Sequence, residues 1–286
     1  MYAVTAATGK LGRLAVAAIL KRQVPAKQLV AAVRSPEKAS DLASQGVLVR
    51  KADYDQLDTL RTALAGVEKL LLVSGNDLGK RVAQHAAVIE AARAAGVRLI
   101  AYTSVLHADR SELGVAESHR ATEQALKSSG IPYVLLRNGW YVENYTASVP
   151  AVLASGAVLG CSGTGRISAA SRADYAEAAA ASLTAADVPA ARVYELAGDG
   201  AFTRADLAAE IARQSGKTIV YRNLSEADYR AALVSAGLPD FLAALLSSSD
   251  AATARGALYE EGQQLSRLIG RPTTTLAQAI SAALKT

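Results

Sequence analysis

Met1-Tyr2-Ala3-Val4-Thr5-Ala6-Ala7-Thr8-Gly9-Lys10-Leu11-Gly12-Arg13-Leu14 is the stretch that decides the fold. An apolar run breaks on small residues and resumes at helical spacing, which predicts a strand, a tight turn and the start of a helix. Such a turn leaves the first N–H groups of the helix unpaired at the positive end of its dipole, so it favours a phosphate. A helix start with two incidental glycines is the alternative. The residues expected at the phosphates are Ala6, Thr8, Gly9, Lys10, Leu11 and Gly12, with Ala6 standing where the dinucleotide-binding pattern usually has glycine.

Six β-rich apolar runs alternate with helix-patterned stretches through the first half of the chain. This alternation predicts an α/β fold with a doubly wound parallel sheet, the Rossmann arrangement. We expect residues 1–150 to form an NADP-binding domain, joined by a returning strand near 192–197, and residues 151–286 to form a smaller, interleaved α/β substrate lobe. The predicted strands are Ala3–Thr5, Leu29–Val33, Val47–Val49, Leu70–Val73, Leu99–Thr103 and Tyr133–Leu136.

Arg34 follows the second predicted strand, about twenty residues beyond the glycine turn. An NAD-binding protein would carry an acidic residue there for the ribose 2′-hydroxyl, whereas an arginine can hold a 2′-phosphate bidentately. Arg34, with Ser35 and Lys38 nearby, therefore predicts NADPH as the cofactor. A solvated arginine at a strand end is the alternative.

The next strand ends carry further candidates, because ligands of such a fold bind beyond the carboxyl ends of the strands. Asp53 offers a carboxylate to the adenine and Tyr54 a ring beside it, although Asp53 or Asp55 could instead cap the following helix. Ser74 and Gly75 suit a close approach of the cofactor, or form a plain turn. After the fifth strand, Thr103 and Ser104 are expected to face the nicotinamide, and His107 is a weaker candidate for proton transfer.

The loop after the sixth strand contains Asn138, Gly139, Trp140, Tyr141 and Asn144. We expect Asn138, Gly139 and Trp140 to contact the cofactor, and Asn138, Trp140, Tyr141 and Asn144 to position a planar substrate with aromatic walls and amides. An aromatic cluster that joins two lobes is the alternative.

None of the eleven tyrosines is followed four residues later by lysine. The helix that would carry such a proton-transfer pair has His119 and Glu123, one turn apart, which could pair and raise the histidine pKa, or form a solvated face. Alcohol oxidation requires a base, whereas hydride delivery to an electron-poor acceptor does not. The chain therefore fits the reduction of quinones or dye cations better.

Composition narrows the class of protein. Net charge is +5, with lysines and arginines dispersed among acidic residues, which disfavours nucleic-acid binding. A single cysteine and three histidines without ligand spacing predict no metal site. The absence of a long apolar run or an export signal predicts no membrane partner and a cytoplasmic location. The oligomeric state stays open.

Five segments together resemble the NmrA-like group of atypical short-chain dehydrogenases/reductases, in particular its quinone-reducing and triphenylmethane-dye-reducing branch. The resemblance implies an NADPH-preferring reductase that lacks the Tyr-Lys pair and carries the aromatic loop beside the nicotinamide. An NADP(H)-sensing regulatory protein without turnover is the alternative, since NmrA-like folds also bind the dinucleotide without using it. The segments are Thr5–Gly12, Ala31–Lys38, Ala101–Asp109, Leu135–Tyr145 and Leu268–Thr275.

Overall fold

The computed structural model describes residues 1–186 and 190–285, and the chain divides into two compact units. The first unit comprises Met1–Ala108, Glu117–Asn138 and Arg172–Tyr194. The second comprises Asp109–Ala116, Gly139–Ser171 and Glu195–Thr286.

A seven-stranded sheet forms the centre of the first unit, in the order β3-β2-β1-β4-β5-β6-β8. The five pairings from β3 across to β6 are parallel, and the strand order reverses beside β1, which is where a doubly wound fold binds its ligand. The predicted fold class is therefore confirmed. The strands are β1 (Tyr2–Thr5), β2 (Leu29–Val33), β3 (Leu48–Lys51), β4 (Lys69–Leu72), β5 (Leu99–Val105), β6 (Tyr133–Asn138) and β8 (Ala191–Leu196).

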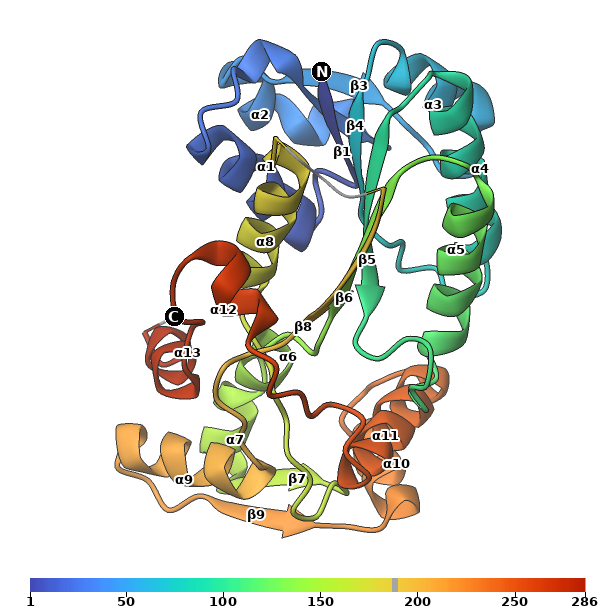
Figure 1. Cartoon of the computed structure of the whole chain (residues 1–286). Helices are drawn as coiled ribbons and strands as arrows, with labels where there is room; N and C mark the ends of the chain where they lie inside the picture. Colours follow the sequence, from blue (N-terminus) through green and yellow to red (C-terminus); the bar gives the residue numbers. More distant parts are fainter. Residues whose placement is uncertain (187–189, 286) are drawn as a thin grey trace. The chain divides into compact units, whose positions relative to one another are not determined.

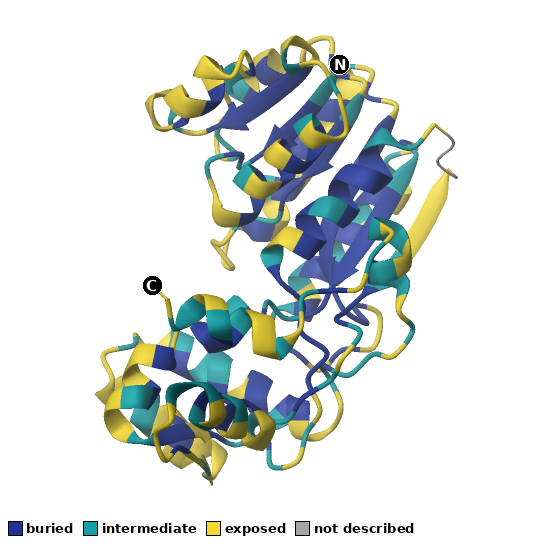
Figure 2. Ribbon diagram, turned by 90° about the vertical axis from the view of Figure 1, so that its left-hand side faces the viewer, coloured by how far each residue is buried: buried dark blue, intermediate teal, exposed yellow. Residues whose placement is uncertain are grey.

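Helices cover both faces of this sheet (Figure 1). The crossovers after β1 and β2 and the returning helix α8 lie on one face, and those after β3, β4 and β5 lie on the other. Because both faces are covered, the central strands are almost continuously apolar and buried, as Figure 2 shows in dark blue. The helices are α1 (Lys10–Lys21), α2 (Ser40–Ser44) and α8 (Arg172–Thr184) on the first face, and α3 (Leu57–Leu64), α4 (Arg81–Ala94) and α5 (Ala116–Ser128) on the second.

The division between the units differs from the boundary predicted near residue 150. It falls between Asn138 and Gly139, and residues 172–194 return to the first unit. The reason is that α8 packs against α1. Most of its buried residues are alanines, whose small side chains let two helices approach closely.

The second unit combines helices with a two-stranded parallel sheet of β7 (Ala157–Gly160) and β9 (Val220–Asn223). The sequence of this region predicts a short strand at 218–221, which overlaps β9, and helices at 203–214, 226–236, 238–246 and 276–284, which overlap four of the observed helices. It predicts a connection at 160–166 and no strand at β7. The helices are α6 (Glu143–Thr146), α7 (Val149–Ser155), α9 (Arg204–Ser215), α10 (Glu226–Ser235), α11 (Asp240–Ala254), α12 (Gln264–Ile269) and α13 (Leu276–Ala283). In the part of the chain that the structure describes, no helix has the length and apolar character that crossing a membrane requires.

Candidate functional site

The turn between β1 and α1 is tight because of Ala6. Its φ of 48° lies in the left-handed region, and its carbonyl oxygen accepts a hydrogen bond from the N–H of Gly9 at 2.8 Å. A Cβ built on Gly12 would lie 2.3 Å from that oxygen, so only glycine fits there. No side chain caps the helix at Gly9, and its first turn holds no acidic residue. The turn therefore presents helix donors to an anion, as a phosphate site requires.

Arg34 lies exposed directly after β2. Its side chain forms no hydrogen bond or ion pair with any residue that the structure describes, so its guanidinium is available to a ligand. The sequence analysis missed a second arginine nearby, Arg13 of α1, which pairs with Asp41 and donates to the carbonyl oxygen of Lys38 at 2.6 Å. The bond from Arg13 lowers the pKa of Asp41. Arg13 thereby fixes the segment that carries Lys38.

Tyr54, expected beside the adenine, has its hydroxyl tied into the sheet. The hydroxyl lies 2.6 Å from Oγ1 of Thr5 and 2.9 Å from the carbonyl oxygen of Val73, and burial raises its pKa. Tyr54 therefore joins the ends of β1 and β4, and it can offer a ligand only the surface of its ring.

Asp53 forms a local turn in which its carboxylate accepts hydrogen bonds from the N–H of Asp55 and from Nε2 of Gln56. The N-cap of α3 is Gln56, so the alternative that Asp53 or Asp55 caps this helix is wrong. The chain turns at Asp53 before α3 begins. The carboxylates of Asp53 and Asp55 therefore both precede the N-cap position of this helix.

The segment after β4 is held by three side chains, one from β5 and two from α4. The N–H of Ser74 donates to Oγ1 of Thr103 at 2.9 Å, and the N–H of Gly75 donates to Nε2 of His85 at 3.0 Å. Arg81 donates from Nε to the carbonyl oxygen of Gly75 at 2.8 Å. Ser74 and Gly75 are thus fixed in the position where the sequence places the cofactor linkage.

His119 and Glu123 do not pair, and both are buried. Nδ1 of His119 lies 2.6 Å from the hydroxyl of Tyr102, and burial together with nearby Arg81 lowers the His119 pKa to about 3. The prediction of a pair that raises this pKa is wrong, and so is that of a solvated face. Helical spacing brought the two residues to one side of α5, but it did not reveal that this side packs on the sheet.

Glu123 instead accepts two hydrogen bonds from Arg137 of β6, at 2.9 and 2.8 Å. It also accepts one from Oγ of Ser104 at 2.6 Å. The Ser104 hydroxyl, expected at the nicotinamide, is therefore directed at α5. His107, in the loop after β5, is buried and has a φ of 52°.

Asn138 ends β6 and is 6% exposed. Its main-chain oxygen accepts the N–H of Leu106 at 2.9 Å, whereas its side-chain oxygen Oδ1 has no hydrogen-bond partner among the described residues. An unpaired buried acceptor is costly, so it is a position where a ligand with an N–H group would gain a hydrogen bond.

The aromatic loop begins the second unit. Gly139 donates its N–H to the carbonyl oxygen of Leu196 at 2.7 Å, and Tyr141 forms a β-bridge with Ala170. Trp140 is half-buried, and Asn144 in α6 is exposed. These main-chain bonds fix the loop at both ends of its aromatic pair.

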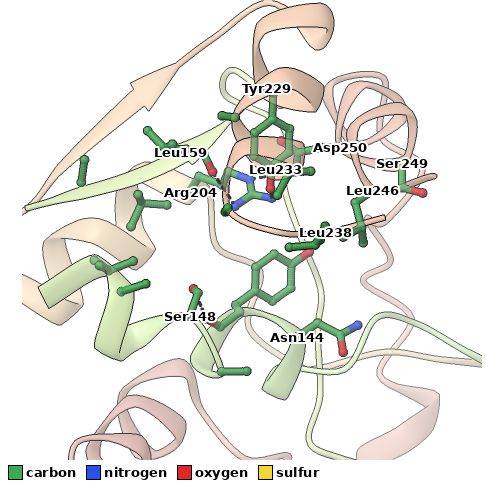
Figure 3. A pocket seen from close by; sticks show the side chains of 18 of the residues that line it. Asn144, Ser148, Leu159, Arg204, Tyr229, Leu233, Leu238, Leu246, Ser249 and Asp250 are labelled. Carbon is green, nitrogen blue, oxygen red and sulfur yellow. Dashed lines mark hydrogen bonds and ion pairs between the residues drawn. The ribbon is translucent and has the colours of Figure 1, made fainter. Parts of the chain in front are cut away.

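Trp140 and Asn144 both line a cavity of about 480 Å³ inside the second unit. Figure 3 shows Arg204, Tyr229 and Asp250 close together, with Leu233 beside them. Most of the lining is aliphatic, and the volume lies in the usual range for small-molecule pockets. Tyr141 and Asn138, two other expected substrate-positioning residues, are not part of this lining.

A buried ion pair forms the polar part of the cavity. Nε of Arg204 donates to Oδ1 of Asp250 at 2.8 Å, and its NH2 group donates to the hydroxyl of Tyr229 at 3.3 Å. Tyr145 presents its ring 5.6 Å from the same guanidinium. A Cβ on Gly160 would lie 2.3 Å from Cδ of Arg204, so glycine at that position admits the pair.

The sequence analysis did not select Arg204, Tyr229 or Asp250. They come from three helices without a shared spacing. The one available signal is Asp250, the only charged residue among the last fourteen positions of the otherwise apolar and small-residue helix α11.

The family of this chain follows from its similarity to known protein sequences and structures. The model of a family described as NAD(P)H-binding matches residues 6–186, which include the turn, Arg34 and Asn138. The chain belongs to the NAD(P)H-binding family. Quinone oxidoreductase 2 of Escherichia coli (strain K12) is 55% identical over 281 residues, 98% of each chain.

Two solved structures resemble this member of the NAD(P)H-binding family throughout. One is the NADPH-dependent quinone oxidoreductase of Escherichia coli complexed with NADPH, with a TM-score of 0.97 and 54% identity over 99% of this chain and 100% of the other. The other is the triphenylmethane reductase of Citrobacter sp. complexed with NADP(H), with a TM-score of 0.94 and 38% identity over 99% of this chain and 100% of the other.

Within the family fold, the expected cofactor residues up to Asn138 lie in the first unit, at the ends of β1 to β6. Gly139 and Trp140 lie in the second unit. No cluster of three or more metal-ligating side chains occurs among residues 1–186 and 190–285.

Proposed function

We propose that this chain is an NADPH-dependent reductase that transfers hydride to quinones or similar flat, electron-poor acceptors. The observation that carries the proposal is 55% identity over 98% of both chains to a quinone oxidoreductase. The uncapped turn at α1 and the unpaired Arg34 agree with it, because they provide the groups that an NADPH-binding protein needs.

The pyrophosphate of the cofactor binds at the N-terminus of α1. Gly9 is exposed there, and the adjacent Lys10 adds a positive charge. Gly12 lets the helix approach Ala6 closely enough for the donors to converge. The residues assigned to this part of the cofactor are Ala6, Thr8, Gly9, Lys10, Leu11 and Gly12.

The ribose 2′-phosphate binds Arg34 and Lys38. Both side chains are exposed, and the segment between them is fixed by the bond from Arg13 to the Lys38 carbonyl oxygen. A planar guanidinium binds a phosphate through two parallel N–H groups, so Arg34 selects NADPH over NADH. Asp53 and the ring of Tyr54 border the adenine, and Ser74 and Gly75 border the linkage.

Asn138 holds the nicotinamide end. Its unpaired Oδ1 accepts a hydrogen bond from the carboxamide, which satisfies the buried acceptor. The other residues that we assign to the nicotinamide end are Thr103, Ser104, Gly139 and Trp140. The hydroxyl of Ser104 already donates a hydrogen bond to Glu123. When bound, NADPH supplies the hydride.

The acceptor is positioned by Trp140, Tyr141 and Asn144, whose rings and amide suit a flat carbonyl compound. No tyrosine of the chain is followed four residues later by a lysine. His85 and His119 have pKa values lowered to about 3, mainly by burial, and burial also raises the pKa of Tyr102. These groups neither gain nor lose a proton near neutral pH, so solvent protonates the reduced acceptor.

We also place the enzyme in the cytoplasm, where its single cysteine would remain reduced. The test is the rate of NADPH consumption with benzoquinone, substituted quinones and a triphenylmethane dye, each compared with a protein-free mixture. Faster consumption with at least one acceptor is expected. Tight NADPH binding without acceleration across the whole panel would contradict the proposal and favour an NADP(H) sensor.

A further inference from the structure

The cavity of the second unit is larger than a single quinone ring requires. An apolar cavity of about 150 Å³ is enough to hold benzene, whereas this one measures about 480 Å³. Trp140 and Asn144 line it together with many aliphatic side chains. Three of these are Leu233, Leu238 and Leu246.

The charges in the cavity cancel. Arg204 and Asp250 neutralise one another at 2.8 Å. Burial raises the pKa values of Tyr145 and Tyr229, so both phenols stay protonated at neutral pH. A ligand that carries its own charge would lose its hydration here without gaining a partner.

We propose that this cavity binds the apolar substituent of an uncharged quinone, so that the enzyme prefers alkyl-substituted or fused-ring quinones over benzoquinone and over charged quinones. The inference rests on the proposed function, since it assigns a specificity pocket to the same acceptor. The substituent packs on the leucines of α10 and α11, and Arg204 and Tyr229 form the polar end of the cavity.

Cys161 lies next to the polar end, outside the cavity lining, and does not compete for this role. The Cys161 thiol donates to the main-chain oxygen of Ser247, and its pKa is raised to about 12 by burial and by Asp250, so it stays protonated and unreactive. The N–H of Cys161 donates to Oδ2 of Asp250 at 2.6 Å, which fixes the carboxylate against Arg204. The polar end is therefore a rigid structure that exists before any ligand binds.

The first experiment uses a series of 2-alkyl-1,4-naphthoquinones of increasing chain length, with benzoquinone as the reference. Each methylene that enters the cavity should raise kcat/KM about threefold to fourfold until the cavity is full. A naphthoquinone sulfonate of similar size should react more slowly than the uncharged compounds. Binding is followed independently of turnover through the emission of Trp140, the only tryptophan of the chain.

The second experiment compares Leu246→Phe with Leu242→Phe. Leu242 lies one turn earlier on α11 and is also half-buried, but it is outside the cavity lining. Leu246→Phe should lower kcat/KM for the longest substrate by about tenfold or more relative to kcat/KM for benzoquinone, with NADPH affinity changed less than twofold. Leu242→Phe should preserve the dependence on chain length.

A third variant, Asp250→Asn, leaves the Arg204 charge without its partner and should shift the preference toward the sulfonate. If Asp250→Asn does not fold, the comparison of the leucine variants still decides. Benzoquinone turnover without any dependence on chain length, or an equal effect of the two leucine variants, would overturn the inference alone. No turnover of any quinone would contradict the proposed function itself.

Discussion

The carbonyl oxygen of Ala6 occupies the space that a side chain on Gly12 would need, 2.3 Å from the position of its Cβ. Gly12→Ala should therefore displace the turn or α1. We expect a loss of at least about 2 kcal/mol in the free energy of unfolding, because the obstacle is main chain. Urea unfolding measures this loss, and Ala17→Gly on the exposed face of α1 provides a control, expected to cost about 1 kcal/mol. A Gly12→Ala protein with an unchanged free energy of unfolding would contradict the close approach of Gly12 to the Ala6 carbonyl oxygen.

Ala6→Gly should have the opposite effect. Ala6 holds a φ of 48°, a region that costs an L-residue about 1–2 kcal/mol and glycine little. We expect the free energy of unfolding to rise by roughly 1 kcal/mol after the greater flexibility of the unfolded chain is included. Thermal unfolding at fixed protein concentration provides the measurement. A destabilised Ala6→Gly protein would show that the methyl group of Ala6 contributes packing that outweighs its strain.

Arg34→Ala should weaken NADPH binding by about 10- to 100-fold and leave NADH binding almost unchanged, because only NADPH carries the 2′-phosphate. Dissociation constants for both cofactors give the answer. Lys21→Ala removes an exposed charge at the opposite end of α1 and controls for the change in net charge. Equal weakening of both cofactors would remove Arg34 from the phosphate site.

Two of the three buried histidines, His85 and His119, should make the protein sensitive to mild acid. Their pKa values are about 3 when folded against an ordinary value of 6.5, so below pH 6.5 the unfolded chain binds more protons than the folded one. The free energy of unfolding should then fall as pH falls, by up to about 1.4 kcal/mol per pH unit for each histidine. Between pH 6 and 5, above most carboxylate titration, His85→Gln should roughly halve this slope. An unchanged slope would mean that His85 is protonated in the folded protein.

Glu123→Gln should destabilise the first unit by about 3–5 kcal/mol, because it removes the Glu123 carboxylate from its buried ion pair with Arg137. The exposed pair of Arg61 and Glu90 offers a matched comparison, and Glu90→Gln should cost less than about 1 kcal/mol. Denaturant unfolding of the two variants compares them directly. Similar small losses would mean that water reaches Glu123.

The first unit could be predicted from sequence because its signals are local. Each central strand is a short apolar run, and the fold that these runs indicated is confirmed, as is the family indicated by the segments of sequence resemblance. Arg34 and Gly9 could be selected because a doubly wound fold places the residue after each strand at one edge. That these residues bind NADPH stays a prediction, which the dissociation constants proposed above would test.

The second unit was less predictable because its cavity depends on contacts between distant segments. Arg204 and Asp250 meet across 46 residues, and the space for them depends on a glycine in β7, a strand that the sequence did not reveal. The failure at His119 has a similar cause. Spacing along a helix says which residues share a side, but only packing decides whether that side meets water or the sheet.

The chain passes from one unit to the other five times, after Ala108, Ala116, Asn138, Ser171 and Tyr194. A single cut anywhere between the first and last of these points leaves at least one unit without a segment that belongs to it. Recombination at one crossover would therefore break up the cofactor unit, the acceptor unit or both. Exchange of acceptor specificity between relatives should proceed through substitutions in the cavity wall, because the second unit is not a cassette that can be transferred whole.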